Sequence, residues 1–312
     1  MLGRTAAGLF WMARHLERAE NTARLIEAGA RISLTRWRDA EDEWGSVLAA
    51  LGMREAYLAG GGRLDGYAVW NHLLRGDHPS SVLSSMDRAR QGAREVRTAL
   101  TRETFEAVNE SWRRIGRALA APVTESALPR VLDIIRERAA LVRGTAHGTM
   151  LRSEVYHFTR LGTHLERADS TARILDVKYY VLLPSARLVG SQVDNAQWET
   201  ILRSVSAHRA YMWVHGGEVT ASGIAHFLLF DARMPRSLAY CYHVVTGDLA
   251  GLEAHHGRAT PAGAMAAELR ATLDRGCIDD VMEAGLHETL DAFRARNAAI
   301  ASRVEADYGF YG

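Results

Sequence analysis

The chain has 312 residues, of which 47% are hydrophobic and 24% are charged, so it carries enough apolar material for a large folded core. Its 38 basic and 37 acidic side chains leave a net charge of +1, which argues against nucleic acid or an anionic membrane as a partner. No apolar run approaches the roughly 20 residues that a membrane-spanning helix needs. Two cysteines without disulfide or metal spacing, and no recognisable signal peptide, lead us to expect a cytoplasmic protein.

Helical periodicity runs through nearly the whole chain, which contains only six prolines. In the first segment, Met12, Leu16, Ala19, Ala23 and Ile26 are spaced by three or four residues and form one apolar stripe. No stretch alternates strictly between apolar and polar residues, so we predict an all-α fold. The further predicted helices cover residues 42–59, 64–75, 80–99, 102–121, 125–148, 152–183, 194–215, 218–230, 236–255, 262–275 and 280–307.

A repeated string indicates an internal duplication. HLERAENTARL at 15–25 and HLERADSTARI at 164–174 share eight of eleven residues at an offset of 149. Weaker matches follow in the same order: Trp44 with Trp198 at offset 154, and 79–81 with 235–237 at offset 156. We therefore expect two helical halves, residues 1–150 and 151–312, packed as a single bundle about a pseudo-twofold axis.

The repeated string places charged side chains beside the apolar stripe of its helix. Glu20 and Arg24 stand four residues apart in the favourable order, and Asp169 and Arg173 repeat this arrangement. Charges this close to a core are costly to bury unless they are paired. We therefore expect a buried ion-pair network or a polar binding site between the two helices; solvent exposure of the charges is the third alternative. The candidate residues of the two segments are Glu17, Arg18, Glu20, Arg24, Glu166, Arg167, Asp169 and Arg173.

Two predicted helix starts carry further polar residues. Ser80, supported by Ser81, is expected to cap the helix that follows Pro79. Arg236 occupies the matching place before Ser237, where a guanidinium beside free backbone N–H groups can bind an anion. We include Arg236 among the candidate binding residues.

The sequence offers little support for metal or nucleophile chemistry. Two E-x-x-H strings, at 154–157 and 253–256, suggest a ferritin-like di-metal site, but the first lies on the same predicted helix as Glu166, which is the wrong connectivity. The chain has no phosphate-binding glycine loop and no nucleophile elbow. We assign no catalytic residue and expect no metal and no cofactor.

The chain resembles the alpha-E family of bacterial all-helical proteins, which is named for a Glu-Arg motif. The resemblance covers essentially the whole chain and rests mainly on GRTAAGLFWMARHLERAENTARLIE at 3–27 and FTRLGTHLERADSTARILDVKYY at 158–180. It implies association with circularly permuted ATP-grasp ligases and transglutaminase-like proteins in a pathway that forms or modifies peptides.

Three hypotheses follow. In the leading one, the chain is a non-enzymatic or co-catalytic helical partner of an ATP-grasp-type ligase, and its Glu-Arg groove docks a partner protein or holds an amino-acid or peptide substrate. Glu17 and Glu166 would hold an amine, and the arginines would clamp a carboxylate or an acyl phosphate. The second hypothesis is an enzyme that uses a carboxylate or a metal. The third is a structural scaffold whose ion pairs lock the two halves together.

Overall fold

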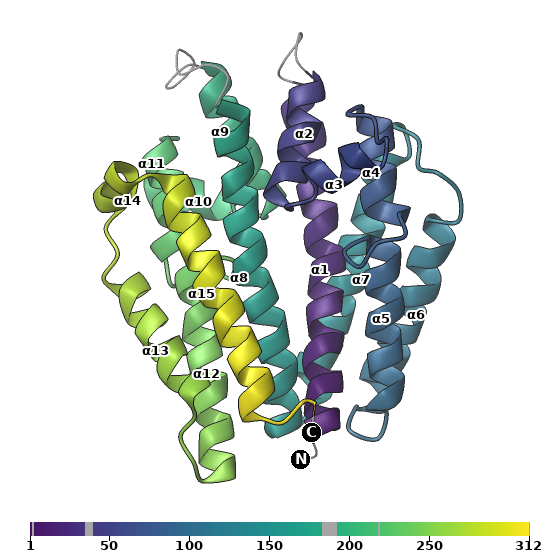
Figure 1. Ribbon diagram of the computed structural model, residues 1–312, viewed down its shortest axis with the longest axis vertical. Helices are drawn as coiled ribbons and strands as arrows, with labels where there is room; N and C mark the ends of the chain where they lie inside the picture. Colours follow the sequence, from purple (N-terminus) through teal and green to yellow (C-terminus); the bar gives the residue numbers. More distant parts are fainter. Residues whose placement is uncertain (2, 35–39, 183–191, 218, 312) are drawn as a thin grey trace.

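Two long helices, α1 (Gly3–Ser33) and α8 (Glu154–Leu182), lie side by side through the middle of the molecule (Figure 1). They run in the same direction: the Met1 amino group lies 3.1 Å from the Glu154 carboxylate, and further along α1 the Arg18 guanidinium meets Glu166. The computed structural model describes residues 1, 3–34, 40–182, 192–217 and 219–311.

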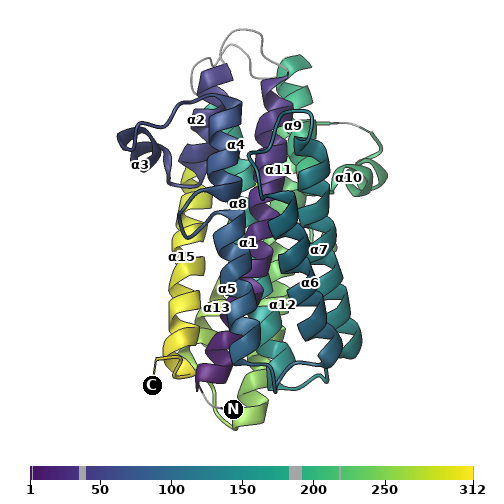
Figure 2. The same ribbon diagram turned by 90° about the vertical axis from the view of Figure 1, so that its right-hand side faces the viewer.

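The remaining helices surround this central pair. Helix α1 packs against α5 and α7, and α8 packs against α12 and α15, so that α1 and α8 are enclosed from both sides (Figures 1 and 2). The other helices of the first half are α2 (Ala40–Ala50), α3 (Arg54–Ala59), α4 (Gly66–Arg75), α5 (Val82–Glu95), α6 (Arg102–Ala118) and α7 (Leu128–Thr149). Those of the second half are α9 (Gln192–Ser204), α10 (His208–His215), α11 (Ala221–Phe230), α12 (Leu238–His256), α13 (Pro261–Asp274), α14 (Ile278–Ala284) and α15 (Leu286–Asp307).

The buried apolar side chains of both halves join in one core. Leu9 and Phe10 of α1 and Leu161 and Leu165 of α8 are fully buried in it. The two helix backbones come very close at Gly162, where a Cβ atom would overlap the carbonyl oxygen of Phe10. This close approach brings polar side chains one or two turns further along α1 and α8 within reach of the opposite helix.

Helices α5 and α12 begin in the same way. Ser81 and Ser237 have φ, ψ angles of −67°, 155° and −67°, 156°, and each hydroxyl accepts a hydrogen bond from the backbone N–H three residues later. The expectation that Ser80 is the cap is therefore wrong by one residue. Ser81 performs that role, because its extended backbone directs its hydroxyl toward the first helical turn. Ser80 lies in the preceding turn.

The all-α prediction is confirmed: every regular element in the described part of the chain is a helix. Three predicted helices are each divided in two, because a residue with positive φ ends an α-helix. The breaks lie at Gly52 (φ 69°) within 42–59, Ser206 (φ 58°) within 194–215, and Gly285 (φ 97°) within 280–307. The duplication, its pseudo-twofold axis and the division at residue 150 stay predictions.

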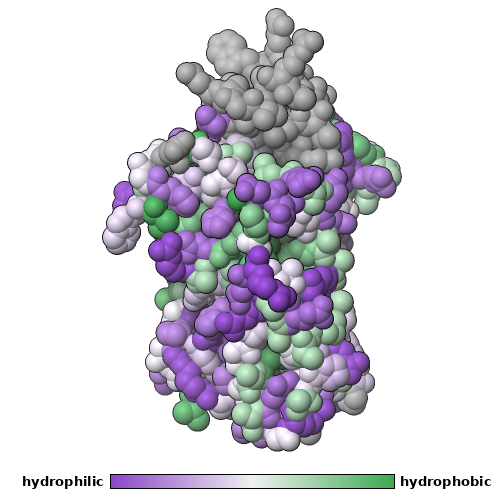
Figure 3. Space-filling view, turned by 90° about the vertical axis from the view of Figure 1, so that its left-hand side faces the viewer, coloured by the Kyte–Doolittle hydropathy of each residue, from purple (hydrophilic) through white to green (hydrophobic). Residues whose placement is uncertain are grey.

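Hydrophilic and hydrophobic residues are interspersed on the face that appears at the left of Figure 1, as the space-filling view shows (Figure 3). Among the described helices, none combines the length and the apolar character needed to cross a lipid bilayer.

Candidate functional site

The Glu-Arg segments meet between α1 and α8, where Glu17 receives guanidinium groups from three other elements. Arg167 of α8 donates from Nε to Oε1 at 2.8 Å and from Nη2 to Oε2 at 3.0 Å, a two-pronged pairing. Arg143 of α7 donates to Oε2 at 3.2 Å, and Arg236, in the turn before α12, lies 3.4 Å from Oε1. Glu17 therefore ties α1 to α7, to α8 and to the start of α12.

Glu20, one turn later on α1, extends the same network. It accepts hydrogen bonds from Arg24 at 2.8 and 3.0 Å, from Arg236 at 2.7 Å and from Arg143. Arg236 also donates to the Asn21 side chain at 2.9 Å. The predicted Glu20–Arg24 pair is thus confirmed, and it forms part of a larger cluster. We call Glu17, Glu20, Arg24, Arg143, Arg167 and Arg236 the closed cluster.

The closed cluster is inaccessible to solvent at its centre, since Glu17 is 1% exposed and Glu20 is 0% exposed. Burial by itself raises the pKa of Glu17, but Arg167, Arg143 and Arg236 together hold it well below the ordinary value. Burial and the neighbouring Arg24 lower the pKa of Arg236 to about 9 against the attraction of Glu20 and Glu17. Arg236 therefore stays charged at neutral pH, and it pairs with the carboxylates of Glu17 and Glu20. These internal carboxylates occupy the place that the sequence analysis expected an external anion to take.

Glu166 of α8 forms a second group of ion pairs with α1. Arg18 donates from Nε to Oε1 at 2.5 Å and from Nη2 to Oε2 at 3.0 Å, and Arg14 donates to Oε2 at 2.9 Å. Burial alone raises the pKa of Glu166, but Arg14 and Arg18 lower it to about 2. This carboxylate is therefore ionised at all physiological pH values.

Asp169 and Arg173, one and two turns after Glu166, are less enclosed. Arg173 donates to Asp169 at 2.6 Å, which confirms the predicted pair, and to the backbone oxygen of Ala50 at 2.7 Å. The side chains of Asp169 and Arg173 keep 22% and 23% of their surface exposed. A second cation, Arg294, lies 3.8 Å from Oδ1 of Asp169, which is beyond hydrogen-bond distance.

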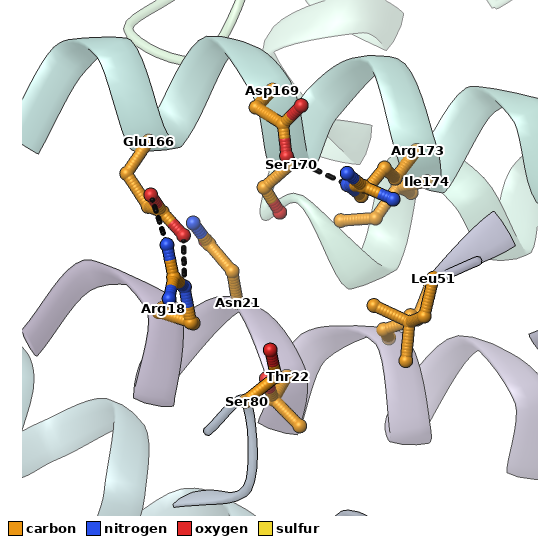
Figure 4. Close-up of a pocket in the computed structure, with 11 residues that line it drawn as sticks. Arg18, Asn21, Thr22, Leu51, Ser80, Glu166, Asp169, Ser170, Arg173 and Ile174 are labelled. Carbon is orange, nitrogen blue, oxygen red and sulfur yellow. Dashed lines mark hydrogen bonds and ion pairs between the residues drawn. The ribbon is translucent and has the colours of Figure 1, made fainter. Parts of the chain in front are cut away.

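A cavity of about 190 Å³ lies beside these side chains, between α1 and α8. Figure 4 shows Glu166, Asp169 and Arg173 of α8 on one side of it, with Arg18 of α1 and Ser80 on the other. Both signs of charge therefore border the same space. We call Arg18, Ser80, Glu166, Asp169, Ser170 and Arg173 the open cluster.

The two clusters contain aligned residues of the repeated segments, in which 15–25 matches 164–174 and 79–81 matches 235–237. Arg24 donates to the backbone oxygen of Ser204 at 2.7 Å, as Arg173 does to that of Ala50. Three side chains around the cavity are shorter than their counterparts in the closed cluster: Asp169 matches Glu20, Ser170 matches Asn21, and Ser80 matches Arg236. All three border the cavity, whereas Arg236 in the closed cluster donates to Glu20 and Asn21.

All nine residues that the sequence singled out lie in these two clusters, five in the closed one and four in the open one. The sequence reasoning did not assign Arg143 or Arg294 to the site, and it considered Ser80 only as a cap. One signal was available for Arg143: it lies within the apolar stripe formed by Ala139, Val142 and Ala146, where a charge needs a partner. The carboxylates of the two clusters that Arg143 and Arg294 approach, Glu17 and Asp169, are more than 100 residues away in sequence, so periodicity does not identify these contacts.

Other reactive groups near the clusters are held in unreactive forms. Burial raises the pKa of the Cys241 thiol to about 12, so it stays protonated at neutral pH. Burial, assisted by Arg167, lowers the pKa of His164 to about 3. Within the described residues, no three side chains of the His, Cys, Asp and Glu types converge in the way that metal ligands do.

Comparisons with known proteins agree with the Glu-Arg arrangement. A protein of Mycobacterium bovis and two from strains of Mycobacterium tuberculosis, all described as uncharacterized, are each 26% identical to this chain over 322 residues. The match covers 97% of this chain but only 35% of each relative. No solved structure matches the chain. The alpha-E model, described as a predicted alpha-helical domain with a conserved ER motif, matches residues 1–308. The chain therefore belongs to the alpha-E family.

Proposed function

We propose that this chain is the helical accessory partner of an ATP-grasp ligase that forms peptide or amide bonds, and that it holds an amino-acid or peptide substrate in the cavity between α1 and α8. The observation that carries the proposal is the open cluster: a cavity of about 190 Å³ bordered by two carboxylates and two guanidinium groups. For comparison, an engineered protein cavity of about 150 Å³ accommodates benzene.

The open cluster retains hydrogen-bonding capacity of both kinds. Within the described part of the chain, Arg18 Nη1 and Arg173 Nη2 donate to no protein acceptor, while the other nitrogens of these guanidinium groups are engaged. Asp169 Oδ1 accepts no hydrogen bond there either. A substrate with an amine and a carboxylate satisfies both sets, because the carboxylate binds the guanidinium donors and the amine binds Asp169.

The closed cluster supports a different role. Its carboxylates are buried and face four guanidinium groups, which leaves no room for a substrate at Glu17 or Glu20. We assign to it the structural part of the Glu-Arg motif: it holds α1 against α7, α8 and the start of α12, and thereby fixes the helix positions that border the cavity.

The partnership with a ligase rests on the family. The resemblance to alpha-E proteins implies ATP-grasp and transglutaminase-like partners. The matched region covers only 35% of each mycobacterial relative, so in those proteins the region similar to this chain is part of a much longer polypeptide. A region that forms part of a longer polypeptide is consistent with an accessory role.

Co-purification from the source cell, followed by an ATP-consumption assay, tests the proposal. The tagged native chain is expected to retain a ligase that consumes ATP in the presence of an amino-acid mixture. When the Asp169→Asn variant replaces the native chain, this ATP consumption is expected to fall at least tenfold. Asp169→Asn preserves the shape of the side chain and removes its charge, and the partial exposure of Asp169 makes a folding defect small.

A matched control is Asp274→Asn, which removes an Asp from a half-exposed pair with Arg270 on α13, outside both clusters. It is expected to leave ATP consumption unchanged. Retention of the ligase with equal ATP consumption in both variants would show that the cavity does not hold the substrate. Failure to retain any ATP-consuming protein would refute the partnership itself.

A further inference from the structure

The turn before α5 and the turn before α12 have the same backbone arrangement but differ at one decisive side chain. Ser81 N–H donates to the His78 oxygen at 3.1 Å, and Ser237 N–H donates to the Met234 oxygen at 2.9 Å. Ser80 and Arg236 immediately precede these two caps. A side chain at position 80 therefore leaves its turn from the same backbone position as Arg236 does.

Arg236 shows what the site after such a turn accepts. Its guanidinium donates to Glu20 at 2.7 Å and to Asn21 at 2.9 Å, and lies 3.4 Å from Glu17. It does so although three further guanidinium groups, those of Arg24, Arg143 and Arg167, bind the same two carboxylates. Three flanking arginines therefore do not exclude a fourth guanidinium group from a site of this design.

The open cluster contains hydrogen-bond acceptors that align with those around Arg236, but it has a serine, Ser80, at the position that aligns with Arg236. Asp169, Ser170 and Glu166 are the counterparts of Glu20, Asn21 and Glu17, and all three border the cavity. Among the described residues, the cations within 4 Å of the Asp169 carboxylate are Arg173 at 2.6 Å and Arg294 at 3.8 Å, whereas Glu20 accepts from Arg24, Arg143 and Arg236. Ser80, which aligns with Arg236, borders the cavity.

We propose that the cavity binds the guanidinium group of an arginine supplied by a ligand, in the place that Arg236 occupies in the closed cluster. This inference rests on the proposed function and narrows its substrate to arginine, either as the free amino acid or as a residue of a peptide. In such a ligand the guanidinium group, in place of an α-amine, binds Asp169, and as a planar, multi-donor cation it also binds the hydroxyls of Ser80 and Ser170. An ammonium group presents fewer donors in a less suitable geometry.

Calorimetric titration of the full chain tests this inference. The probes are L-arginine, N-acetyl-L-arginine amide, L-lysine and L-alanine. We expect arginine to bind at least tenfold more tightly than lysine and alanine. Binding of the blocked arginine amide with equal affinity identifies a peptide side chain as the ligand, and loss of its binding identifies the free amino acid. Both outcomes support the guanidinium site.

The decisive variant is Ser80→Arg, which supplies the missing guanidinium from the chain itself. It is expected to weaken arginine binding at least tenfold and to raise the melting temperature, because its side chain pairs with Asp169. Ser126→Arg, in the exposed segment before α7, adds the same charge away from the cavity and is expected to change neither quantity. Asp169→Asn serves as a second variant and is expected to weaken arginine binding at least tenfold.

The possible failures are distinguishable. If alanine and arginine bind equally and Ser80→Arg changes neither affinity, the guanidinium site is refuted while an amino-acid site survives. If none of the four probes binds, both the guanidinium site and the amino-acid function proposed for the cavity are refuted.

Discussion

Arg167 donates two parallel hydrogen bonds of 2.8 and 3.0 Å to Glu17, and this almost completely buried pair joins the two central helices. Arg18 grips Glu166 in the reverse direction, from α1 to α8, at 2.5 and 3.0 Å. Each helix therefore supplies one carboxylate to the other, and α1 supplies the guanidinium groups of Arg14 and Arg18 where α8 supplies that of Arg167. Such reciprocal pairing fixes the relative rotation and translation of α1 and α8.

Removal of the Glu17 charge is expected to destabilise the fold strongly. Glu17→Gln leaves the buried guanidinium groups of Arg167 and Arg236, and the partly exposed Arg143, without one of their carboxylates, which costs about 3–5 kcal/mol of the free energy of unfolding. Urea denaturation measures the loss. Glu106→Gln, which breaks the exposed pair with Arg102, is the control and should change stability by less than about 0.5 kcal/mol. Equal effects of the two substitutions would contradict a buried structural role.

The Glu17–Arg167 pair is expected to be energetically interdependent. A double-mutant cycle of Glu17→Gln and Arg167→Gln should give a coupling energy of about 1–3 kcal/mol, because each single variant leaves the other charge buried without its main partner. The same cycle on Arg102 and Glu106 should give less than about 0.5 kcal/mol. Strictly additive effects at Glu17 and Arg167 would show that Arg143 and Arg236 fully replace Arg167.

The close approach of α1 and α8 predicts opposite results for two helical glycines. Gly162→Ala places a Cβ against the Phe10 carbonyl oxygen, and the rigid backbone of α1 has to shift. We expect a loss of about 1–3 kcal/mol, as for other overpacked cores. Gly116→Ala on α6, where a Cβ meets nothing within 4 Å, should instead stabilise by about 0.5–1 kcal/mol. Thermal unfolding of both variants checks this, and a stabilised Gly162→Ala would contradict the contact.

The two buried histidines predict a loss of stability in mild acid. Burial lowers the pKa of His15 to about 4 and that of His164 to about 3, from an ordinary value of 6.5. As the pH falls below about 6.5, the unfolded chain binds protons that the folded chain does not, so the free energy of unfolding decreases. Between pH 7.5 and 5, each histidine accounts for about 2 kcal/mol of this decrease.

Urea denaturation at both pH values, on the native chain and on His164→Gln, measures this effect. The difference in stability between the two pH values should be about 2 kcal/mol smaller in the variant. An unchanged difference would mean that His164 is protonated in the folded state. Glu166, whose pKa is lowered from 4.5 to about 2, contributes stability that is lost mainly as the pH falls from about 4.5 to about 2, below the range of this comparison.

Local sequence determined the helices and the short-range ion pairs. Apolar spacing along the chain predicts an all-α fold, and the i,i+4 placement of Glu20 with Arg24 and of Asp169 with Arg173 predicts pairs that the structure contains. These features depend on residues within one or two helical turns of each other. Apolar spacing did not predict the breaks at Gly52, Ser206 and Gly285, because hydrophobic periodicity continues across a single residue with positive φ.

Tertiary structure alone decided which charges meet and where space remains. Arg143 reaches Glu17 from a position 126 residues away, and Arg236 reaches Glu20 across 216 residues. Near-identical segments thus acquired different environments: one carboxylate cluster is closed by Arg236, and the other is left open beside Ser80. The reason is physical. A helical repeat specifies which side chains share a face, but only the packing of distant elements determines whether a guanidinium or a cavity lies opposite that face.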